Sequence, residues 1–563
     1  MTGPAPKNST PTDSRKPGHP QETEHAAGDA RALYGSAGVV TFFTLLSRVL
    51  GMARDLVISH RFGAGSATDA WVQAFRIPNA LRRLTAEGSM TIAFVPVYVE
   101  ERAREGREAA LRFARQALGL VLAVTLALSA LGMIFSETLT LVFSPGFQAD
   151  PEKFALTAAL LRWSFPYLVL VSLVAWAMGV LNAEKRFAAP AAAPVFLNLG
   201  IIVFVAWLSW GFTPPILAVS AGVLAGGLAQ VLLQLPSLGA VGVSLNPLGG
   251  WRSAPMRRLF ALMLPSLFGV AVYQINLITL GIIASYLPTG QIFHYNNATR
   301  LTELVMGLFT FAFATAGLPQ LSEHHSRKDW DRMRDTLRLT LSATLFTVFP
   351  ALAGLVAGAQ GIVSMLYLHG AFTHADVLST AASLQAMALG MPAVALVRVM
   401  VPVFYAFGDA RKPVAVSTLT LFVTGGLGWL LSLRYEVVGL SLGLSLGAWF
   451  QCGALALSLR GREKVLGDWF PWRAVRLQGA VALVMGLLVA WIQGYGDWAL
   501  GSFSPRNWAV FLIFVFGGAG GYLAGTLALG EREAGNWLNL FRRLAVRLAT
   551  RSSRHNHRTE DPK

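Results

Sequence analysis

The sequence has little charge and almost no cysteine. Of its 563 residues, 13% are charged and 54% are hydrophobic, and the mean hydropathy is +0.51. This composition excludes an ordinary soluble protein of several domains and is typical of a polytopic membrane protein. The single cysteine, Cys452, stands in an apolar stretch, which excludes a disulfide framework and a cysteine metal cluster.

Several functional motifs are also missing. No Gly-rich phosphate loop precedes a Lys-Ser/Thr pair, so the chain is not an ATPase of the Walker type. Histidines occur in predicted loops at 324–325, 369 and 374, but without the cysteines and acids of a metal site, so we expect no metal and no cofactor. No apolar region follows Met1, and residues 1–31 are predicted to be a disordered cytoplasmic tail instead of a signal peptide.

Apolar segments long enough to cross about 30 Å of hydrocarbon recur along the chain. We count fourteen of them. They are 32–61, 68–99, 107–143, 152–183, 189–211, 213–238, 255–286, 291–322, 330–358, 375–408, 412–434, 438–460, 474–496 and 507–530. The fold class is therefore predicted to be an all-α polytopic membrane protein with 14 transmembrane helices.

The lysines and arginines support this count. With both termini in the cytoplasm, the tails and cytoplasmic turns hold 34 of the 46, the opposite turns hold four, and eight fall inside the segments. A missed segment would invert every later turn, so this asymmetry indicates the orientation as well as the number of spans. The net charge of +16 then faces the cytoplasm and anionic lipid, and no nucleic-acid partner is needed to explain it.

The chain also repeats itself. The pattern "AFVPVYVE" at 93–100 returns as "AGLPQLSE" at 316–323, and "VLNAEKRFAAP" at 180–190 returns in outline as "YAFGDARKP" at 405–413. A duplicated unit of six spans would give two parallel lobes related by an axis along the membrane normal, with the substrate path between them. The predicted parts are the tail 1–31, an N-lobe 32–250, a C-lobe 251–465, two additional helices within 466–530 and a basic cytoplasmic tail 531–563.

Arginines are concentrated in the first two segments. The eight cations inside the segments are Arg48, Arg54, Arg76, Arg82, Arg83, Arg162, Arg300 and Arg398. At 100° per residue, Arg76, Arg83 and Glu87 fall near one face of a helix, and Arg48 and Asp55 fall on one face of another. Because intramembrane charges face water or one another, we predict that these side chains surround a wet cavity.

This cavity is predicted to carry excess positive charge. Seven central arginines, leaving out Arg162 near a segment end, meet four acids, Asp55, Asp69, Glu87 and Glu303. An unmatched arginine at mid-membrane costs about 2.5–3.5 kcal/mol even on the gentler insertion scale. An anion is the expected partner, and phosphate oxygens suit the guanidinium fork. Purely structural ion pairs, such as Arg48 with Asp55 or Arg83 with Glu87, remain an alternative for part of the set.

The stretch "SRVLGMARDLVISHRFGAGSATDAWVQAFRIPNALRRLTAEGSMTIAFVPVY" at 47–98 resembles the signature of the MurJ (MviN) family of lipid II flippases. The segments "GVLNAEKRFAAPAAAPVFLN" at 179–198 and "VMVPVFYAFGDARKP" at 399–413 are similar to later parts of the family pattern. The resemblance implies the multidrug/oligosaccharidyl-lipid/polysaccharide exporter fold, with two extra helices forming a groove for a polyprenyl tail. It also implies that the substrate is lipid II, the undecaprenyl-diphosphate-linked precursor of peptidoglycan, moved outward across the bacterial inner membrane.

The resemblance further implies the binding residues. Ser47, Arg48, Arg54 and Asp55 match the first-helix motif, Asp69 matches an acid near the outer end of the second helix, and the others match polar cavity positions. Those others are Asn79, Arg82, Arg83, Glu87, Arg300 and Glu303. The chain departs from the pattern where some members bind sodium, because no acid occurs from Trp251 through Thr302 or from Arg411 through Tyr435.

Other interpretations stay open at this point. Hinge candidates are Gly51, Gly63, Gly65, Pro78 and Gly88, although close helix packing explains such residues equally well. The alternatives to a lipid II flippase are an exporter of another polyprenyl-linked oligosaccharide, a cation-coupled multidrug antiporter of the same fold, and a membrane glycosyltransferase or phosphatase. The expected partners are lipid II, membrane lipids and cell-wall synthesis or division proteins, and the expected state is a monomer.

Overall fold

The computed structural model describes residues 20–83, 89–461, 466–539 and 542, and within these ranges it contains helices and connecting segments but no strand. The first helices are α1 (Pro20–Phe62), α2 (Ser66–Arg82), α3 (Ser89–Glu105), α4 (Arg107–Ile134), α5 (Ser136–Phe143), α6 (Pro151–Ser164), α7 (Tyr167–Ala183), α8 (Ala188–Val203) and α9 (Leu217–Ala240). They are followed by α10 (Ala254–Ala284), α11 (Gln291–Ser326), α12 (Trp330–Ala357), α13 (Ala359–Tyr367), α14 (His374–Ala388), α15 (Met391–Ala406), α16 (Arg411–Arg460), α18 (Trp472–Gln493), α19 (Pro505–Leu512) and α20 (Gly518–Ala528).

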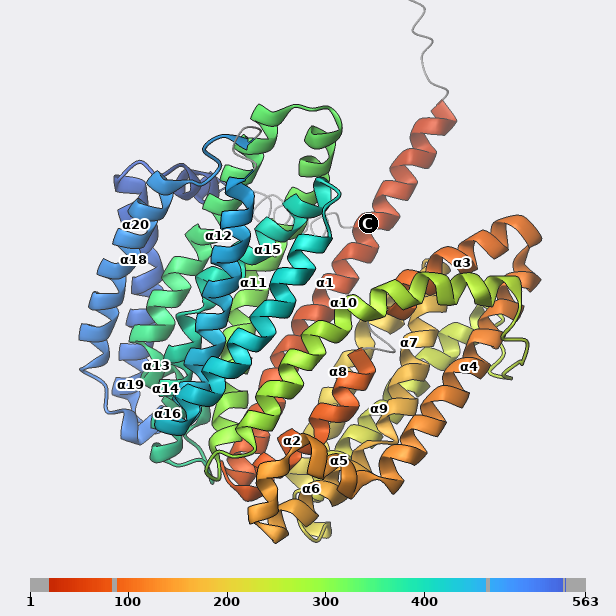
Figure 1. Ribbon diagram of the computed structural model, residues 1–563, viewed down its shortest axis with the longest axis horizontal. Coiled ribbons are helices and arrows are strands. Elements are labelled where there is room, and N and C mark those ends of the chain that lie inside the picture. Colours follow the sequence, from red (N-terminus) through yellow and green to blue (C-terminus); the bar gives the residue numbers. More distant parts are fainter. Residues whose placement is uncertain (1–19, 84–88, 462–465, 540–541, 543–563) are drawn as a thin grey trace, which may run out of the picture.

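The helices form two groups that meet at one end of the molecule and lie apart at the other (Figure 1). Helices α1 to α9 make up the first group, in which α1 packs on α8, and helices α11 to α20 make up the second. Helix α10 packs on both α3 and α16, and its C-terminal part, which contacts α16 near Leu280 and Ile283, is counted with the second group. We call the end where the groups meet the joined end. It is held by backbone and side-chain hydrogen bonds, from Ala371 N to His60 O at 2.9 Å and from Gln73 Nε2 to Gly281 O at 2.7 Å.

Small residues let helices of the first group approach closely. A Cβ atom built on Gly200 of α8 would lie 2.6 Å from the Gly226 Cα of α9, and one on Gly222 would lie 2.8 Å from the Ile201 Cα. Real Cβ atoms do not approach a backbone so closely, so these glycines are required by the contact itself. This is the packing that membrane helices use, because lipid supplies no hydrophobic force between them.

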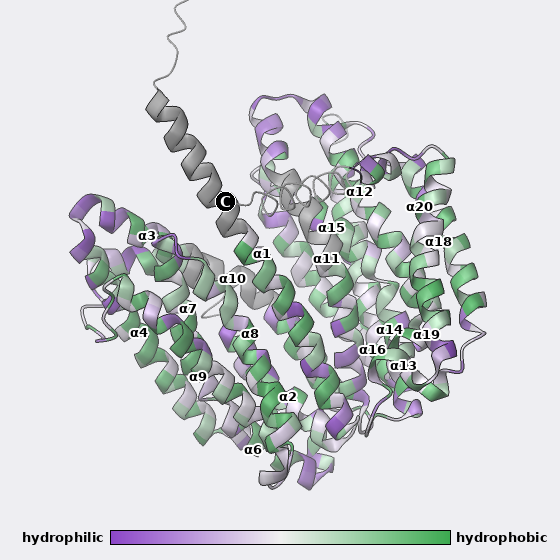
Figure 2. Cartoon of the chain, turned by 180° about the vertical axis from the view of Figure 1, so that it is seen from behind, coloured by the Kyte–Doolittle hydropathy of each residue, from purple (hydrophilic) through white to green (hydrophobic). Residues whose placement is uncertain are grey.

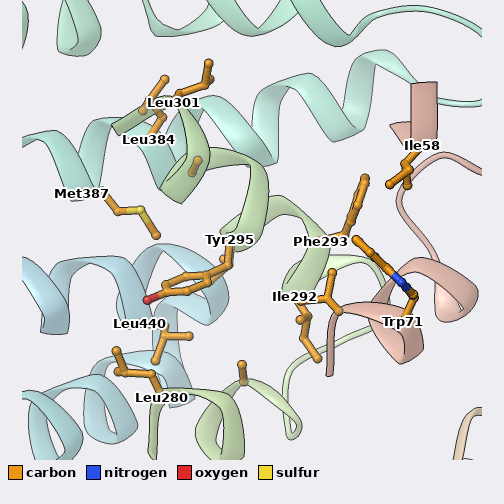
Figure 3. Close-up of a cluster of buried hydrophobic side chains, with 14 of the residues drawn as sticks. Ile58, Trp71, Leu280, Ile292, Phe293, Tyr295, Leu301, Leu384, Met387 and Leu440 are labelled. Carbon is orange, nitrogen blue, oxygen red and sulfur yellow. The ribbon is translucent and has the colours of Figure 1, made fainter. Parts of the chain in front are cut away.

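A continuous apolar core crosses from one group to the other at the joined end. Ile58 of α1, Trp71 of α2 and Phe293 of α11 belong to the same buried cluster, and Figure 3 shows the three side chains beside one another. Tyr295, two residues further along α11, extends toward Met387 and Leu440 of the second group (Figure 3). The contact between the groups is therefore a packed interface of about the same kind as a protein core.

Hydrophobic residues make up much of the length of many helices (Figure 2). Phe422 of α16 and Leu483 of α18 are 68% and 66% exposed, as expected of side chains that face lipid. Among the described residues, nine helical stretches are long and apolar enough to cross a membrane. They are Arg107–Ile134, Pro151–Ala183, Ala188–Gly211, Leu217–Ala240, Trp330–Ala357, His374–Ala406, Arg411–Arg460, Trp472–Gln493 and Pro505–Ala528. The all-helical membrane fold is confirmed, and the count of fourteen spans stays a prediction.

Some predicted boundaries differ from the structure. Helix α1 begins at Pro20, so its first turns lie within the stretch 1–31 predicted as a disordered tail; alanine, glutamate and arginine there have high helix propensity. The predicted segment 68–99 is described as two helices, α2 and α3, with 84–88 outside the described residues. The segments 412–434 and 438–460 both fall within α16, which breaks at Glu436 with a φ of 48°.

Candidate functional site

A cavity of about 620 Å³ lies between the two groups of helices. Its walls come from α1, α10, α11, α14, α15 and α16, with one residue from the end of α2. Its charged lining residues are Arg48, Arg54, Arg83, Arg300, Arg398, Asp55 and Glu303. Five arginines and two acids leave an excess of three positive charges among the described lining residues. The structure thus brings together five of the central arginines that the sequence places inside membrane segments.

Asp55 ties two of these arginines together across the interface between the groups. Its Oδ1 accepts hydrogen bonds from Arg54 Nη2 at 2.7 Å and Arg54 Nε at 2.9 Å, and its Oδ2 lies 3.6 Å from Arg300 Nε. Arg300 also lies 3.5 Å from Glu303, one turn along α11. Two guanidinium groups from opposite halves therefore share one carboxylate, which orients both toward the same cavity.

Asn198 of α8 fixes the position of Arg54 and was not predicted from the sequence. Its Oδ1 accepts from Arg54 Nη1 at 3.1 Å, and its Nδ2 donates to the Ser47 carbonyl at 3.0 Å. The sequence signal that could have found Asn198 is a single amide in an otherwise apolar helix, and the structure shows that this side chain is buried. Ser47 itself is placed by this contact through its backbone, and it does not contribute to the described cavity lining.

Arg48 and Arg83 line the cavity without an ionic partner among the described residues. Arg48 Nη1 lies close to the backbone of α11, since a Cβ built on Gly307 would be 2.9 Å from it. The structural ion pair between Arg48 and Asp55 is wrong, because the carboxylate of Asp55 is occupied by Arg54 and Arg300. The other candidate pair, Arg83 with Glu87, includes a residue outside the described part of the chain.

A smaller pocket of about 120 Å³ adjoins the cavity and is called the side pocket here. It is lined by Trp71, Val72, Phe75, Arg76, Asn79, Arg83, Leu277, Leu280, Tyr295, Asn296, Thr299, Arg300 and Glu303. Asn79, a predicted binding residue, lies here and accepts a hydrogen bond from Arg82 Nε at 3.0 Å. Arg82 is not among the residues that line either space, and its Nε holds the Asn79 side chain through this hydrogen bond.

Asp69 does not face the cavity. It is fully buried at the joined end, where its Oδ2 lies 2.8 Å from Lys153 Nζ and accepts from Gly290 N at 2.7 Å. Its Oδ1 accepts from Phe293 N at 2.9 Å. In this structure the Asp69 carboxylate caps the first turn of α11 and joins the two groups of helices, and binding of substrate by Asp69 stays a prediction.

Replacing Asp69 by asparagine is expected to destabilise the protein by about 3–5 kcal/mol, because it leaves the Lys153 ammonium buried without a counter-charge. The measurement is the thermal unfolding midpoint of the purified protein in detergent. The double variant Asp69→Asn/Lys153→Met is the control, and it should recover much of the loss because it removes both charges. A single variant with the midpoint of the unsubstituted protein would contradict the role of the pair.

The hinge candidates have different environments. Gly51 lies inside an uninterrupted α1 and faces Asn198, while Gly63 and Gly65 lie between α1 and α2, Gly63 with a φ of 64°. Pro78 stands within α2, which continues past it. Glu87 and Gly88 lie outside the described residues. Only the connection at 63–65 has the backbone freedom that a bend requires, and its use as a hinge stays a prediction.

Further cavity residues were not in the predicted set. Arg398 of α15 is an intramembrane cation by sequence, and the structure adds it to the lining of the cavity; Asn276 and Tyr295 line the same space. In the described ranges, no three His, Cys, Asp or Glu side chains lie close enough together to hold a metal ion. The chemistry of the site is therefore that of arginine and amide donors set among apolar side chains in one cavity.

Comparison with known proteins agrees with this site. The family described as "Lipid II flippase MurJ" matches residues 58–508. A probable lipid II flippase MurJ of Vibrio cholerae is 34% identical over 513 residues, which cover 89% of this chain and 97% of that protein. A solved structure of lipid II flippase MurJ in an inward closed conformation has a TM-score of 0.72 at 24% identity, covering 87% of this chain and 98% of its own.

A more distant structure shares the fold as well. The inward-facing conformation of a multidrug resistance MATE family transporter of the MOP superfamily gives a TM-score of 0.63 at 13% identity, covering 75% of this chain and 95% of its own. This likeness concerns the fold alone. The sequence match over 58–508 and the identity to the Vibrio cholerae protein are specific, and with them the chain belongs to the MurJ family of lipid II flippases.

Proposed function

We propose that this protein moves lipid II from the cytoplasmic to the periplasmic leaflet of the bacterial inner membrane by alternating access through the central cavity. It is a transporter and not an enzyme. The observation that carries the proposal is the excess of three positive charges in a cavity between two groups of membrane helices. A diphosphate supplies the missing negative charge, and its oxygens accept the paired N–H donors of guanidinium groups.

The site suggests how the substrate is held. Without substrate, Asp55 is the acceptor for Arg54 and lies near Arg300. A diphosphate entering the cavity competes with this carboxylate for the same donors and adds Arg48, which has no ionic partner among the described residues. Charge-assisted hydrogen bonds of this kind contribute about 1.5–3 kcal/mol each. The diphosphate is therefore the part of lipid II that the two halves of the protein grip together.

Release on the far side requires the joined end to open. The contacts that must break are the hydrogen bonds from Gly290 and Phe293 to Asp69, and the two described above for His60 and Gln73. All of them link the first group of helices to the second. Opening here, with closure at the opposite end, exposes the same arginines to the other leaflet, which is the geometry of alternating access around a fixed site.

The proposal includes the finer topology. Fourteen spans, two parallel six-helix repeats and cytoplasmic termini follow from the apolar segments, the charge asymmetry and the internal repeat. The family resemblance adds a polyprenyl-tail groove formed by the two C-terminal helices, and a monomeric state completes the proposal. The break of α16 at Glu436 supports two spans where one long helix would otherwise be counted. Contact with cell-wall synthesis or division proteins stays a further prediction.

Three other functions fit the site less well. A cation-coupled drug antiporter binds organic cations and needs acids and aromatic rings in its cavity, whereas the charged residues described in this lining are five arginines and two acids. An exporter of another polyprenyl-linked oligosaccharide would share the diphosphate and is the closer alternative. A glycosyltransferase or phosphatase needs clustered acids or histidines, and the described cavity walls carry two acids beside five arginines.

Depletion of the protein in its native cell is the test. Lipid II is expected to accumulate in the inner leaflet, where it stays inaccessible to a periplasmic enzyme or antibiotic that binds its head group. Expression of the unsubstituted chain should restore access. Accumulation of a different polyprenyl-linked sugar, with normal exposure of lipid II, would support the closer alternative instead.

A further inference from the structure

The side pocket contains an arginine that the contacts of the protein leave unsatisfied. Arg76 of α2 lines the pocket, and its Nη1 is buried without a hydrogen-bond partner among the described residues. Three arginines, Arg76, Arg83 and Arg300, line this pocket together with one acid, Glu303, which already lies 3.5 Å from Arg300. A buried guanidinium without a counter-charge is costly, so the pocket favours an anionic occupant.

The position of Arg76 is fixed by close contact with the second group of helices. A Cβ built on Gly281 of α10 would overlap Arg76 Nη1, so only glycine leaves room for the guanidinium at this point. One turn before it on α2, Gln73 donates to the Gly281 carbonyl at 2.7 Å. The guanidinium is therefore held between the two groups of helices and not free to turn toward water.

The remaining lining can hold a small planar anion. Asn79 and Asn296 contribute amide groups, while Trp71, Phe75 and Tyr295 contribute aromatic rings, with Trp71 and Phe75 stacked at 6.0 Å. The indole Nε1 of Trp71 is a further buried donor without a partner among the described residues. Donors in this arrangement exceed acceptors, which is the pattern of an anion site and not of a cation site.

The size of the pocket identifies the kind of group that fits. About 120 Å³ is several times the roughly 10–15 Å³ that one water requires, so a carboxylate with a few waters fits. A diphosphate in lipid II is substituted at both ends, by the polyprenyl chain and by the sugar, and it needs a wide passage on both sides. A space of this size suits a terminal group, and the terminal anions of lipid II are the carboxylates of its peptide.

We propose that the side pocket is a second anion subsite, in which Arg76 binds a peptide carboxylate of the substrate while the diphosphate occupies the central cavity. The two spaces share Arg83 and Arg300, so one branched molecule can reach both at once. This inference rests on the proposed function. It gives the protein a means of selecting a peptide-bearing lipid over a polyprenyl diphosphate that carries sugar alone.

The test compares binding of lipid II with binding of lipid II whose peptide carboxylates are amidated, using purified protein in lipid nanodiscs. The unsubstituted protein is expected to prefer the acidic form by about 10- to 100-fold, the usual value of a charge-assisted hydrogen bond. Arg76→Gln should remove this preference and leave binding of the amidated form unchanged. Gly281→Ala, which displaces the guanidinium without removing its charge, should weaken the preference as well. Arg162→Gln, an exposed arginine outside both spaces, is the matched control and should keep it.

Other results would overturn the subsite. If Arg76→Gln keeps the preference for the acidic lipid, or weakens the binding of both lipids equally, Arg76 does not bind the carboxylate. If the variant keeps the preference but loses a dependence of binding on chloride or inorganic phosphate, the occupant is a free anion. If the unsubstituted protein binds neither lipid, the proposed function fails together with the subsite, whereas equal binding of both lipids rejects the subsite alone.

Discussion

Replacing Arg54 by alanine is expected to abolish the ability of the protein to support growth, while the chain still inserts into the membrane. Arg54 makes three hydrogen bonds, two to Asp55 and one to Asn198, and it presents the guanidinium to the cavity. Its removal takes away a donor pair for the diphosphate and leaves Asp55, which is 5% exposed, with Arg300 as its remaining described ionic partner at 3.6 Å. Removing one partner of a buried ion pair lowers the free energy of unfolding by about 3–5 kcal/mol.

The measurement is complementation of a depleted strain, with the amount of protein in the membrane fraction quantified in parallel. The same loss is expected for alanine at Arg48, Arg82 and Arg300, although Arg82 acts through Asn79. Arg54→Lys should not restore growth, because an ammonium lacks the planar fork. Arg162→Ala, which removes an exposed arginine, is the control and should complement. Growth with all four alanine variants would refute the anion site.

Much of the site could be predicted because it lies on continuous helices. A period of 3.6 residues places Arg48, Arg54 and Asp55 within two turns of one another, and the cost of charge in a bilayer directs them to a polar cavity. Arg300 and Glu303 follow the same rule on α11. The excess of positive charge also follows from counting, since membrane segments contain few acids. What is predictable in this way is local geometry together with composition.

The partners of these residues were not predictable from periodicity. Neighbouring residues on a helix do not face each other, and yet the long side chain of Arg54 folds back onto Asp55, because Asn198 from a helix 144 residues away holds its other nitrogen. The position of Asp69 at the joined end was not predicted for a similar reason. Its partners, Lys153 and the first turn of α11, are set by tertiary packing that no local pattern encodes.

The driving force is where the chain departs from its family resemblance. The sequence has no acid from Trp251 through Thr302 or from Arg411 through Tyr435, the regions where some members are expected to hold sodium. Threonines stand there instead, and the hydroxyls of Thr418 and Thr420 donate to the carbonyls of Val414 and Val416 at 2.9 and 2.8 Å. A site made of neutral oxygens without a carboxylate attracts a monovalent cation only weakly.

Transport is therefore expected to follow the membrane potential and to need no sodium gradient. Moving a diphosphate outward carries negative charge toward the positive side of the membrane, and each elementary charge that crosses is worth about 2.3 kcal/mol per 100 mV. The empty protein then returns its cationic cavity inward, and the same potential assists this step. The measurement is lipid II transport in reconstituted vesicles with a clamped potassium-diffusion potential, with and without sodium. The control is a vesicle at zero potential with a sodium gradient, where the rate should fall to background.

Cation binding through backbone carbonyls and the hydroxyls of Thr418, Thr420 and Thr424 is the competing explanation. This competing explanation would hold if transport follows the sodium gradient at zero potential and does not respond to the membrane potential when sodium is absent.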